Sequence, residues 1–145
     1  MKRSKRLEPV GELVDEEERE CALKVANYQK RLDEAQKRAL ELRRYLVEYQ
    51  SMFQQRAAAG MGVAGLRDYQ TFLARLTDAV RQQESVVAQV ESDCARARVN
   101  WLEAAARKNA VSKVISNART EDQRLEDRRS QKESDEQAQR RSAES

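Results

Sequence analysis

The feature that most constrains this chain is a seven-residue repeat of apolar residues, which occurs in two long stretches. From Cys21 to Phe53 the apolar positions are separated by alternating steps of four and three residues, and Glu18 fills the one gap before them. The positions of this first seam are Val14, Cys21, Val25, Tyr28, Leu32, Ala35, Ala39, Leu42, Leu46, Tyr49 and Phe53. The repeat predicts a long helix that packs along a narrow coiled-coil seam.

The second stretch carries the same repeat, with only Gln83 and Lys108 as polar members. Its positions are Leu66, Tyr69, Leu73, Leu76, Val80, Gln83, Val87, Val90, Cys94, Ala97, Trp101, Ala104, Lys108, Val111, Ile115 and Ala118. Neither stretch contains a proline, and the single proline, Pro9, suits the first turn of the first helix. Charged residues make up 37% of the chain and aromatic residues 5%, so little apolar surface remains for any thicker core.

Between the two repeats, the segment from Ala57 to Gly65 has no charged residue and contains three glycines, Gly60, Gly62 and Gly65. Glycine accepts the positive φ angles that a helix end or turn requires, so we expect the chain to reverse here. The predicted fold is all-α: one coiled-coil domain in which two long helices form an antiparallel hairpin. We expect the first helix at about 9–57, the turn at about 58–65, the second helix at about 66–128 and a frayed tail at about 129–145.

These bounds make the second helix longer than the first. We therefore expect Val111, Ile115 and Ala118 to project beyond the first helix and to have no partner within the chain. The same register places Cys21 near Trp101, and Cys94 near Tyr28. The cysteines are then about two turns apart, too far for a disulfide, and are expected to be small core residues of a cytoplasmic protein.

Several function classes are disfavoured by composition. The chain has no histidine, and its glycines are not followed by the Gly-Lys-Ser/Thr that binds nucleotide phosphates, so we expect no enzyme, cofactor or metal site. Acidic and basic residues alternate nearly everywhere, without aromatic residues beside the basic pairs, and we expect no nucleic-acid binding. No stretch is apolar enough to insert into a membrane.

A set of residues on one flank of the predicted seam is the best candidate for function. The register brings Arg38, Leu42, Tyr45 and Tyr49 level with Gln83, Ala79, Leu76 and Phe72. Tyr45, Phe72 and Ala79 each fall one position before a seam residue, so they should be partly exposed. Two readings remain open: the flank is a binding surface, or it widens the packing against another helix or subunit. Both readings require that another helix or protein cover these side chains.

Two segments of the chain resemble a known family. These are Tyr45-Leu46-Val47-Glu48-Tyr49 and, after the glycine-rich turn, the segment from Leu66-Arg67-Asp68-Tyr69-Gln70 to Phe72-Leu73-Ala74-Arg75-Leu76. Together with Trp101 in Arg98-Val99-Asn100-Trp101 and the tail from Gln131 to Ala138, they resemble the FliJ family of flagellar export proteins.

This resemblance implies a non-enzymatic component of the flagellar type III export apparatus, acting in flagellum biogenesis and through it in chemotaxis. Its fold would be similar to the central stalk of rotary ATPases. The implied partners are the hexameric export ATPase, whose assembly and activity it promotes, the cytoplasmic domain of the membrane export gate, and export chaperones that it escorts. The implied location is cytoplasmic, at the inner face of the membrane below the flagellum.

The resemblance also assigns residues to two contacts. The implied gate-binding residues are those of the flank, namely Arg38, Leu42, Tyr45, Tyr49, Phe72, Leu76, Ala79 and Gln83, although Arg38 and Gln83 replace the family's glutamine and histidine. For the ATPase we expect contacts at Val14, Cys21, Val111, Ile115 and Arg119, beside the projecting seam. The alternatives are an injectisome stalk of the same architecture, or a structural coiled coil or oligomerisation protein without an ATPase partner.

Overall fold

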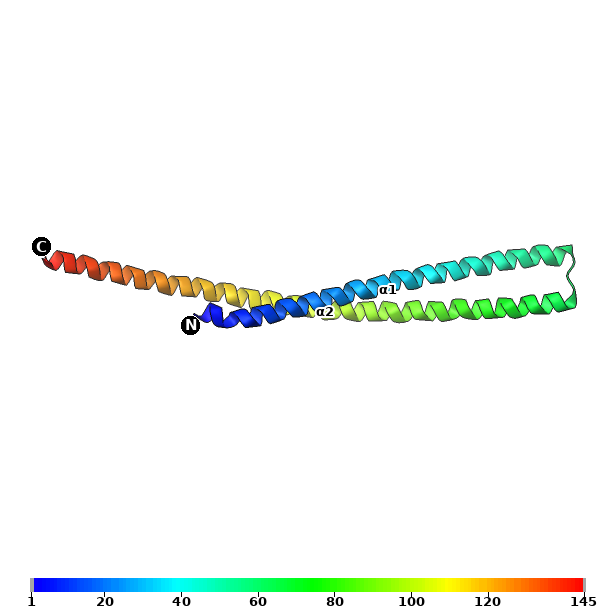
Figure 1. Ribbon diagram of the computed structural model, residues 1–145, viewed down its shortest axis with the longest axis horizontal. Helices are drawn as coiled ribbons and strands as arrows, with labels where there is room; N and C mark the ends of the chain where they lie inside the picture. Colours follow the sequence, from blue (N-terminus) through cyan, green and yellow to red (C-terminus); the bar gives the residue numbers. More distant parts are fainter. Residues whose placement is uncertain (1, 145) are drawn as a thin grey trace. The chain divides into compact units, whose positions relative to one another are not determined.

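The computed structural model describes residues 2–144 and contains two helices, α1 (Arg3–Ala59) and α2 (Val63–Glu144), with no strand among these residues (Figure 1). The helices pack against each other, which confirms the all-α fold and the hairpin. Both are longer than the sequence predicted. α1 begins at Arg3 instead of about residue 9, and the connection is confined to residues 60–62 instead of 58–65.

Glycine ends α1, as the sequence indicated. Gly60 has a φ of 97° and its amide donates to the carbonyl of Ala57 (3.3 Å), the geometry of a glycine C-cap. α2 starts immediately, because the amide of Leu66 donates to the carbonyl of Gly62 at 3.0 Å. Gly65 thus lies inside α2 and not in the turn.

Pro9 lies inside α1 and not in its first turn, contrary to expectation. A proline there removes one backbone hydrogen bond, the one to the carbonyl of Lys5. Both residues are exposed, so water can take the place of the missing amide. The helix therefore continues through Pro9 towards Arg3.

The predicted seam is confirmed at every position named above, all of which are buried or half-buried. The most deeply buried members are small: Ala104 is 1% exposed and Ala118 is 3% exposed. A contact between only two helices is narrow, so it encloses a methyl group but leaves one edge of a larger side chain open. Cys21 is half-buried and Cys94 buried, and both are free thiols, as expected.

By its internal contacts the chain divides into two compact units. Unit 1 combines Met1–Cys21 with Asn100–Ser145, and unit 2 is Ala22–Val99. Each unit contains one segment of α1 and one of α2.

In unit 1 the expectation that Val111, Ile115 and Ala118 lack a partner is wrong. The early start of α1 brings Ser4, Leu7 and Gly11 onto the same seam, where Ser4 is buried and the other two are half-buried. A Cβ on Gly11 would lie only 2.8 Å from Cδ1 of Ile115, so the side chain of Ile115 packs directly against Gly11. The seam that we expected to be bare is closed within the chain.

The predicted frayed tail is also corrected, since α2 extends as a helix to Glu144. This stretch contains neither glycine nor proline and is rich in Glu, Gln and Arg, which favour helix. Side-chain bonds one turn apart, such as Gln131 to Asp135 (3.1 Å), add support. Residues 127–144 are all exposed, and α2 continues beyond the start of α1 (Figure 1).

Candidate functional site

The aromatic flank of unit 2 is the set of eight residues assigned above to the gate: Arg38, Leu42, Tyr45, Tyr49, Phe72, Leu76, Ala79 and Gln83. The structure brings its two helices together as the register predicted, with the rings of Tyr49 and Phe72 4.7 Å apart and tilted by 54°. Tyr45 is 53% exposed and Phe72 is 42% exposed. Partly exposed aromatic side chains at one edge of the seam are thus confirmed.

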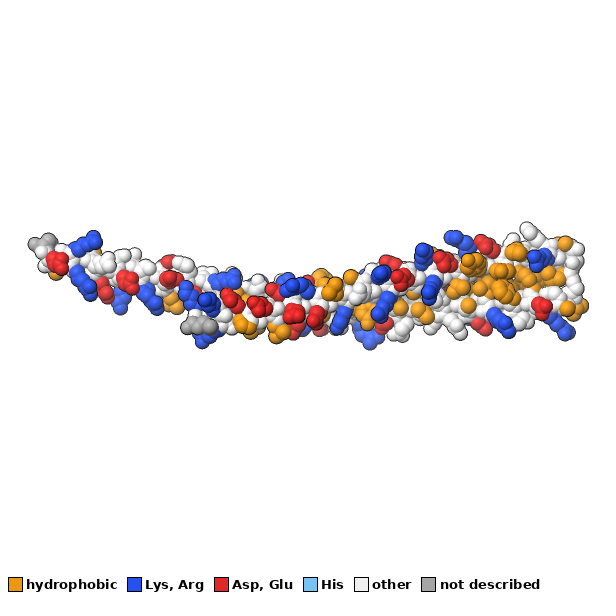
Figure 2. Space-filling model, viewed as in Figure 1, with side chains coloured by type: hydrophobic (Ala, Val, Ile, Leu, Met, Phe, Trp, Pro, Cys, Tyr) orange, Lys and Arg blue, Asp and Glu red, His pale blue; other side chains and the backbone are white. Residues whose placement is uncertain are grey.

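The other members of the aromatic flank form its floor and its far end. Leu42, Leu76 and Ala79 are half-buried, so their outer surfaces remain open, and Arg38 is exposed. Hydrophobic side chains gather on one face of unit 2 next to the turn (Figure 2). Tyr and Phe beside aliphatic side chains are typical anchors of protein interfaces.

Gln83, one of the three polar residues that interrupt the predicted seam, has a structural role. Its Nε2 donates across the hairpin to the backbone carbonyl of Ala35 at 3.1 Å. This bond satisfies a polar group in the seam and fixes the side chain at the end of the aromatic flank. Gln83 and Arg38 both line a groove of about 580 Å³, and Val86 and Val90 are among its other lining residues.

Sequence reasoning missed two apolar residues beside the flank, Val86 and Met52. Both are exposed. Each falls one position before a seam residue, Val87 and Phe53, which is the spacing that singled out Tyr45 and Phe72. The same criterion, applied along the whole seam, would have found both.

The opposite flank of unit 2 has a different character. Leu40 (66% exposed) and Val47 (64% exposed) lie there, but no aromatic residue accompanies them. Between them Arg43 pairs with Glu84, with Nε to Oε1 at 2.8 Å. This ion pair interrupts the apolar surface, so the aromatic flank is the stronger candidate for a binding site.

In unit 1 the residues expected to contact an ATPase lie mostly between the helices. Val14 is buried, Cys21, Val111 and Ile115 are half-buried, and Arg119 is exposed. Val14, Ile115 and Arg119 line a groove of about 360 Å³ along the seam. Only Arg119 therefore presents its side chain fully to a partner.

The two other polar interruptions of the seam, Glu18 and Lys108, meet in unit 1. Nζ of Lys108 lies 3.8 Å from Oε2 of Glu18, and Nε1 of Trp101 donates to Oε1 of the same carboxylate at 3.1 Å. A polar layer of this kind fixes the register of two helices, because any shift would leave its members without partners.

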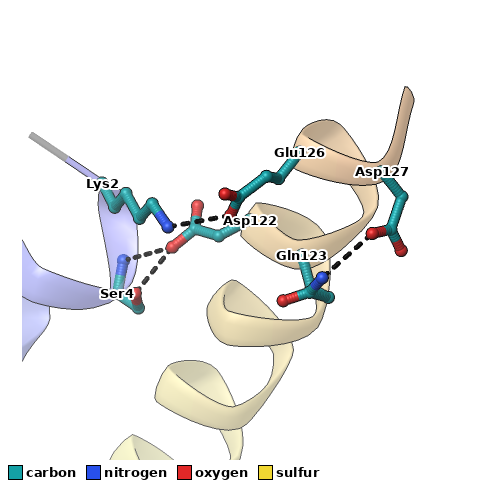
Figure 3. A network of polar contacts seen from close by, with 6 residues as sticks. All are labelled: Lys2, Ser4, Asp122, Gln123, Glu126 and Asp127. Atoms are coloured by element: carbon teal, nitrogen blue, oxygen red, sulfur yellow. Dashed lines mark hydrogen bonds and ion pairs between the residues drawn. The ribbon is translucent and has the colours of Figure 1, made fainter. Parts of the chain in front are cut away.

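The start of α1 is held to α2 by a second polar cluster (Figure 3). The carboxylate of Asp122 accepts hydrogen bonds from the hydroxyl and the backbone amide of Ser4, at 2.6 and 3.2 Å. Nζ of Lys2 pairs with Glu126 at 3.1 Å. The Ser4 hydroxyl, the Ser4 amide and the charge of Lys2 lower the pKa of Asp122. Asp122 thus caps a free amide of the first turn of α1 from the other helix.

Comparison with known proteins decides the family. The family model described as "Flagellar FliJ protein" matches residues 3–145. The chain belongs to the FliJ family. No curated protein and no solved structure matches it.

Membership of the FliJ family confirms the resemblance seen in the sequence and makes the chain a component of the flagellar export apparatus. The family is a non-catalytic part of that apparatus. Membership of this family also favours the flagellar interpretation over the alternative of an injectisome stalk. No helix within residues 2–144 is long and apolar enough to cross a bilayer. In the same part of the chain, no three Cys, Asp or Glu side chains cluster so as to hold a metal ion.

Proposed function

We propose that this FliJ-family protein is the stalk of the flagellar export ATPase. It inserts into the ATPase hexamer, promotes its assembly and activity, couples it to the export gate and escorts export chaperones. It acts at the inner face of the membrane, at the flagellar base. The observation that carries the proposal is the aromatic flank, an exposed interface-like surface in a member of a non-catalytic family of the export apparatus.

The aromatic flank supports a contact with the cytoplasmic domain of the gate. Tyr45 and Phe72 expose much of their rings, although the ring of Phe72 packs against Tyr49 of the other helix. Burying such rings against a partner contributes roughly 25 cal/mol per Å² of apolar area removed from water. The hairpin cannot gain this energy by itself, because two helices cover only one face of each other.

The gate contact is tested by measuring the affinity of the purified gate domain for the variant Tyr45→Ala/Phe72→Ala. We expect a loss of about tenfold or more, because truncated aromatic anchors typically cost about 2 kcal/mol or more. The matched control is Leu23→Ala/Val99→Ala, which truncates two exposed apolar residues of unit 2 outside the flank. Equal loss in both variants, or loss of helical content in the first, would contradict the proposal.

Unit 1 supports the ATPase contact through its exposed surface. The exposed part of α2, residues 127–144, is helical and alternates charges of both signs, so a ring of subunits can surround it. Arg119 lies about two turns before this part, and we propose that both contact the ATPase directly. Val14, Cys21, Val111 and Ile115 contribute by packing the two helices on which that contact depends.

The ATPase contact is tested with the cognate export ATPase and a chain truncated after Glu126. This truncation keeps Ser4, Asp122 and the Lys2–Glu126 pair, whereas truncation after Lys108 would also remove residues that pack against α1. We expect the full chain to stimulate ATP hydrolysis and the truncated chain to stimulate it much less. A competent ATPase that gains nothing from the full chain would refute the stalk role.

A further inference from the structure

A groove of about 440 Å³ lies in unit 1 where the start of α1 meets α2. Four of its seven lining residues are cationic, two are acidic and one is aliphatic. They are Lys2, Arg3, Arg6, Asp122, Leu125, Glu126 and Arg129. None of them belongs to the aromatic flank, and only Arg129 lies in the part of α2 that we propose for the ATPase contact.

Both carboxylates of this groove are already engaged within the chain. Asp122 accepts two hydrogen bonds from Ser4, and Glu126 is paired with Lys2 (Figure 3). Within residues 2–144, by contrast, the guanidinium groups of Arg3, Arg6 and Arg129 have no hydrogen bond or ion pair. The groove therefore presents three unpaired cations against no unpaired anion.

The groove also exposes an aliphatic side chain, since Leu125 is 53% exposed. Guanidinium groups are planar and bind carboxylates through two parallel hydrogen bonds. We propose that this groove binds an acidic segment of a partner protein, with carboxylates on the three arginines and an aliphatic side chain on Leu125. The inference rests on the charges of the groove and does not depend on the proposed function.

An acidic protein segment fits these observations better than a nucleic acid or a membrane. No aromatic residue lines the groove to stack on a base. The exposed residues Glu8, Glu12 and Glu121 on the same two helices interrupt the basic surface, so it does not extend into the broad basic face that a duplex or an anionic bilayer attracts.

The test is fluorescence anisotropy of a labelled peptide made of glutamate and leucine, titrated with the full chain at about 150 mM salt, where long-range attraction between exposed charges is largely screened. We expect saturable binding that weakens about tenfold or more in Arg3→Gln/Arg129→Gln, which removes two of the three guanidinium groups. The matched control, Arg140→Gln/Arg141→Gln, removes the same charge from the exposed end of α2 and should bind as the unchanged chain does. A peptide with glutamine in place of glutamate should not bind.

A second variant, Leu125→Glu, keeps the proposal testable if the arginine variant loses helix. It places a negative charge in the groove at an exposed position and should weaken binding of the acidic peptide. The proposal is overturned if the unchanged chain does not bind the peptide, or if both arginine pairs weaken binding equally. It is also overturned if an oligonucleotide or phosphatidylglycerol vesicles bind more tightly than the peptide.

Discussion

The two units share one pair of helices but close their seams in different ways. Unit 2 uses large residues, with Tyr49 against Phe72 and Phe53 stacked on Tyr69 at 4.5 Å. Unit 1 uses small and polar residues, such as Gly11, Ala104 and Ala118, together with two polar clusters. Large side chains are too wide to be enclosed by a two-helix seam. Part of their surface stays exposed and forms an apolar flank that a partner can cover. Small side chains are enclosed by the seam itself, and the exposed large apolar residues of unit 1, such as Leu13 and Leu125, include no aromatic ring.

The largest effect is expected from a charge in the apolar seam of unit 2. Leu46→Asp should lower the free energy of unfolding by about 3 kcal/mol, because the carboxylate would lie half-buried without a partner. Val47→Asp is the matched control, since Val47 is exposed, and should change stability by less than about 0.5 kcal/mol. Urea unfolding followed by circular dichroism gives both values. Equal stability of the two variants would show that the seam runs elsewhere.

In unit 1 the corresponding probe is the close approach at Gly11. Gly11→Leu should cost about 2 kcal/mol, because even a Cβ would lie 2.8 Å from Ile115 and the longer side chain must displace it. At Gly65 a Cβ would meet only the side chain of Met61, with Cγ at 3.4 Å and Sδ at 3.9 Å, so Gly65→Ala should instead stabilise the helix by about 0.5–1 kcal/mol. Thermal unfolding shows whether each substitution lowers or raises the stability of the protein. A neutral Gly11→Leu would mean that the helices are further apart than described.

A smaller effect is expected at Tyr69, whose buried hydroxyl has no hydrogen-bond partner in the part of the chain that the structure describes. Tyr69→Phe should keep the stacking on Phe53 and raise stability by about 1 kcal/mol, because an unsatisfied polar group leaves the seam. Tyr49→Phe, at a half-buried ring of the same seam, serves as the comparison. If Tyr69→Phe destabilises the protein, the hydroxyl has a partner after all.

The smallest effect is local and depends on pH. The folded chain lowers the pKa of Asp122, so its bonds to Ser4 stabilise the start of α1 above the ordinary aspartate pKa of about 3.9. This stabilisation is lost as the pH falls through the lower pKa of the folded state. Hydrogen exchange at the Ser4 amide should therefore lose protection at low pH, after correction for the intrinsic rate. In Asp122→Asn this pH dependence should disappear, and its persistence would contradict the assignment.

Periodicity predicted the fold because a heptad repeat specifies which face of a helix is buried. The same repeat placed Tyr45 and Phe72 beside the seam and not within it. It did not predict the ends of the helices. Ser4, Leu7 and Gly11 continue the spacing, but serine and glycine carry no apolar signal, so the seam seemed to stop at Val14. The role of Asp122 could not be predicted from the sequence either, because it depends on the hydroxyl and the backbone amide of Ser4 on the other helix.

The central claim is that a partner docks on the aromatic flank of unit 2 and not on its opposite flank. Replacing Tyr45 or Val47, one at a time, with a photoreactive phenylalanine analogue tests this directly, because both positions are exposed and lie two residues apart on α1. The account predicts that irradiation in flagellated cells cross-links position 45 to the export gate protein and leaves position 47 without that product. Equal cross-linking from both positions, or cross-linking from position 47 alone, would contradict it.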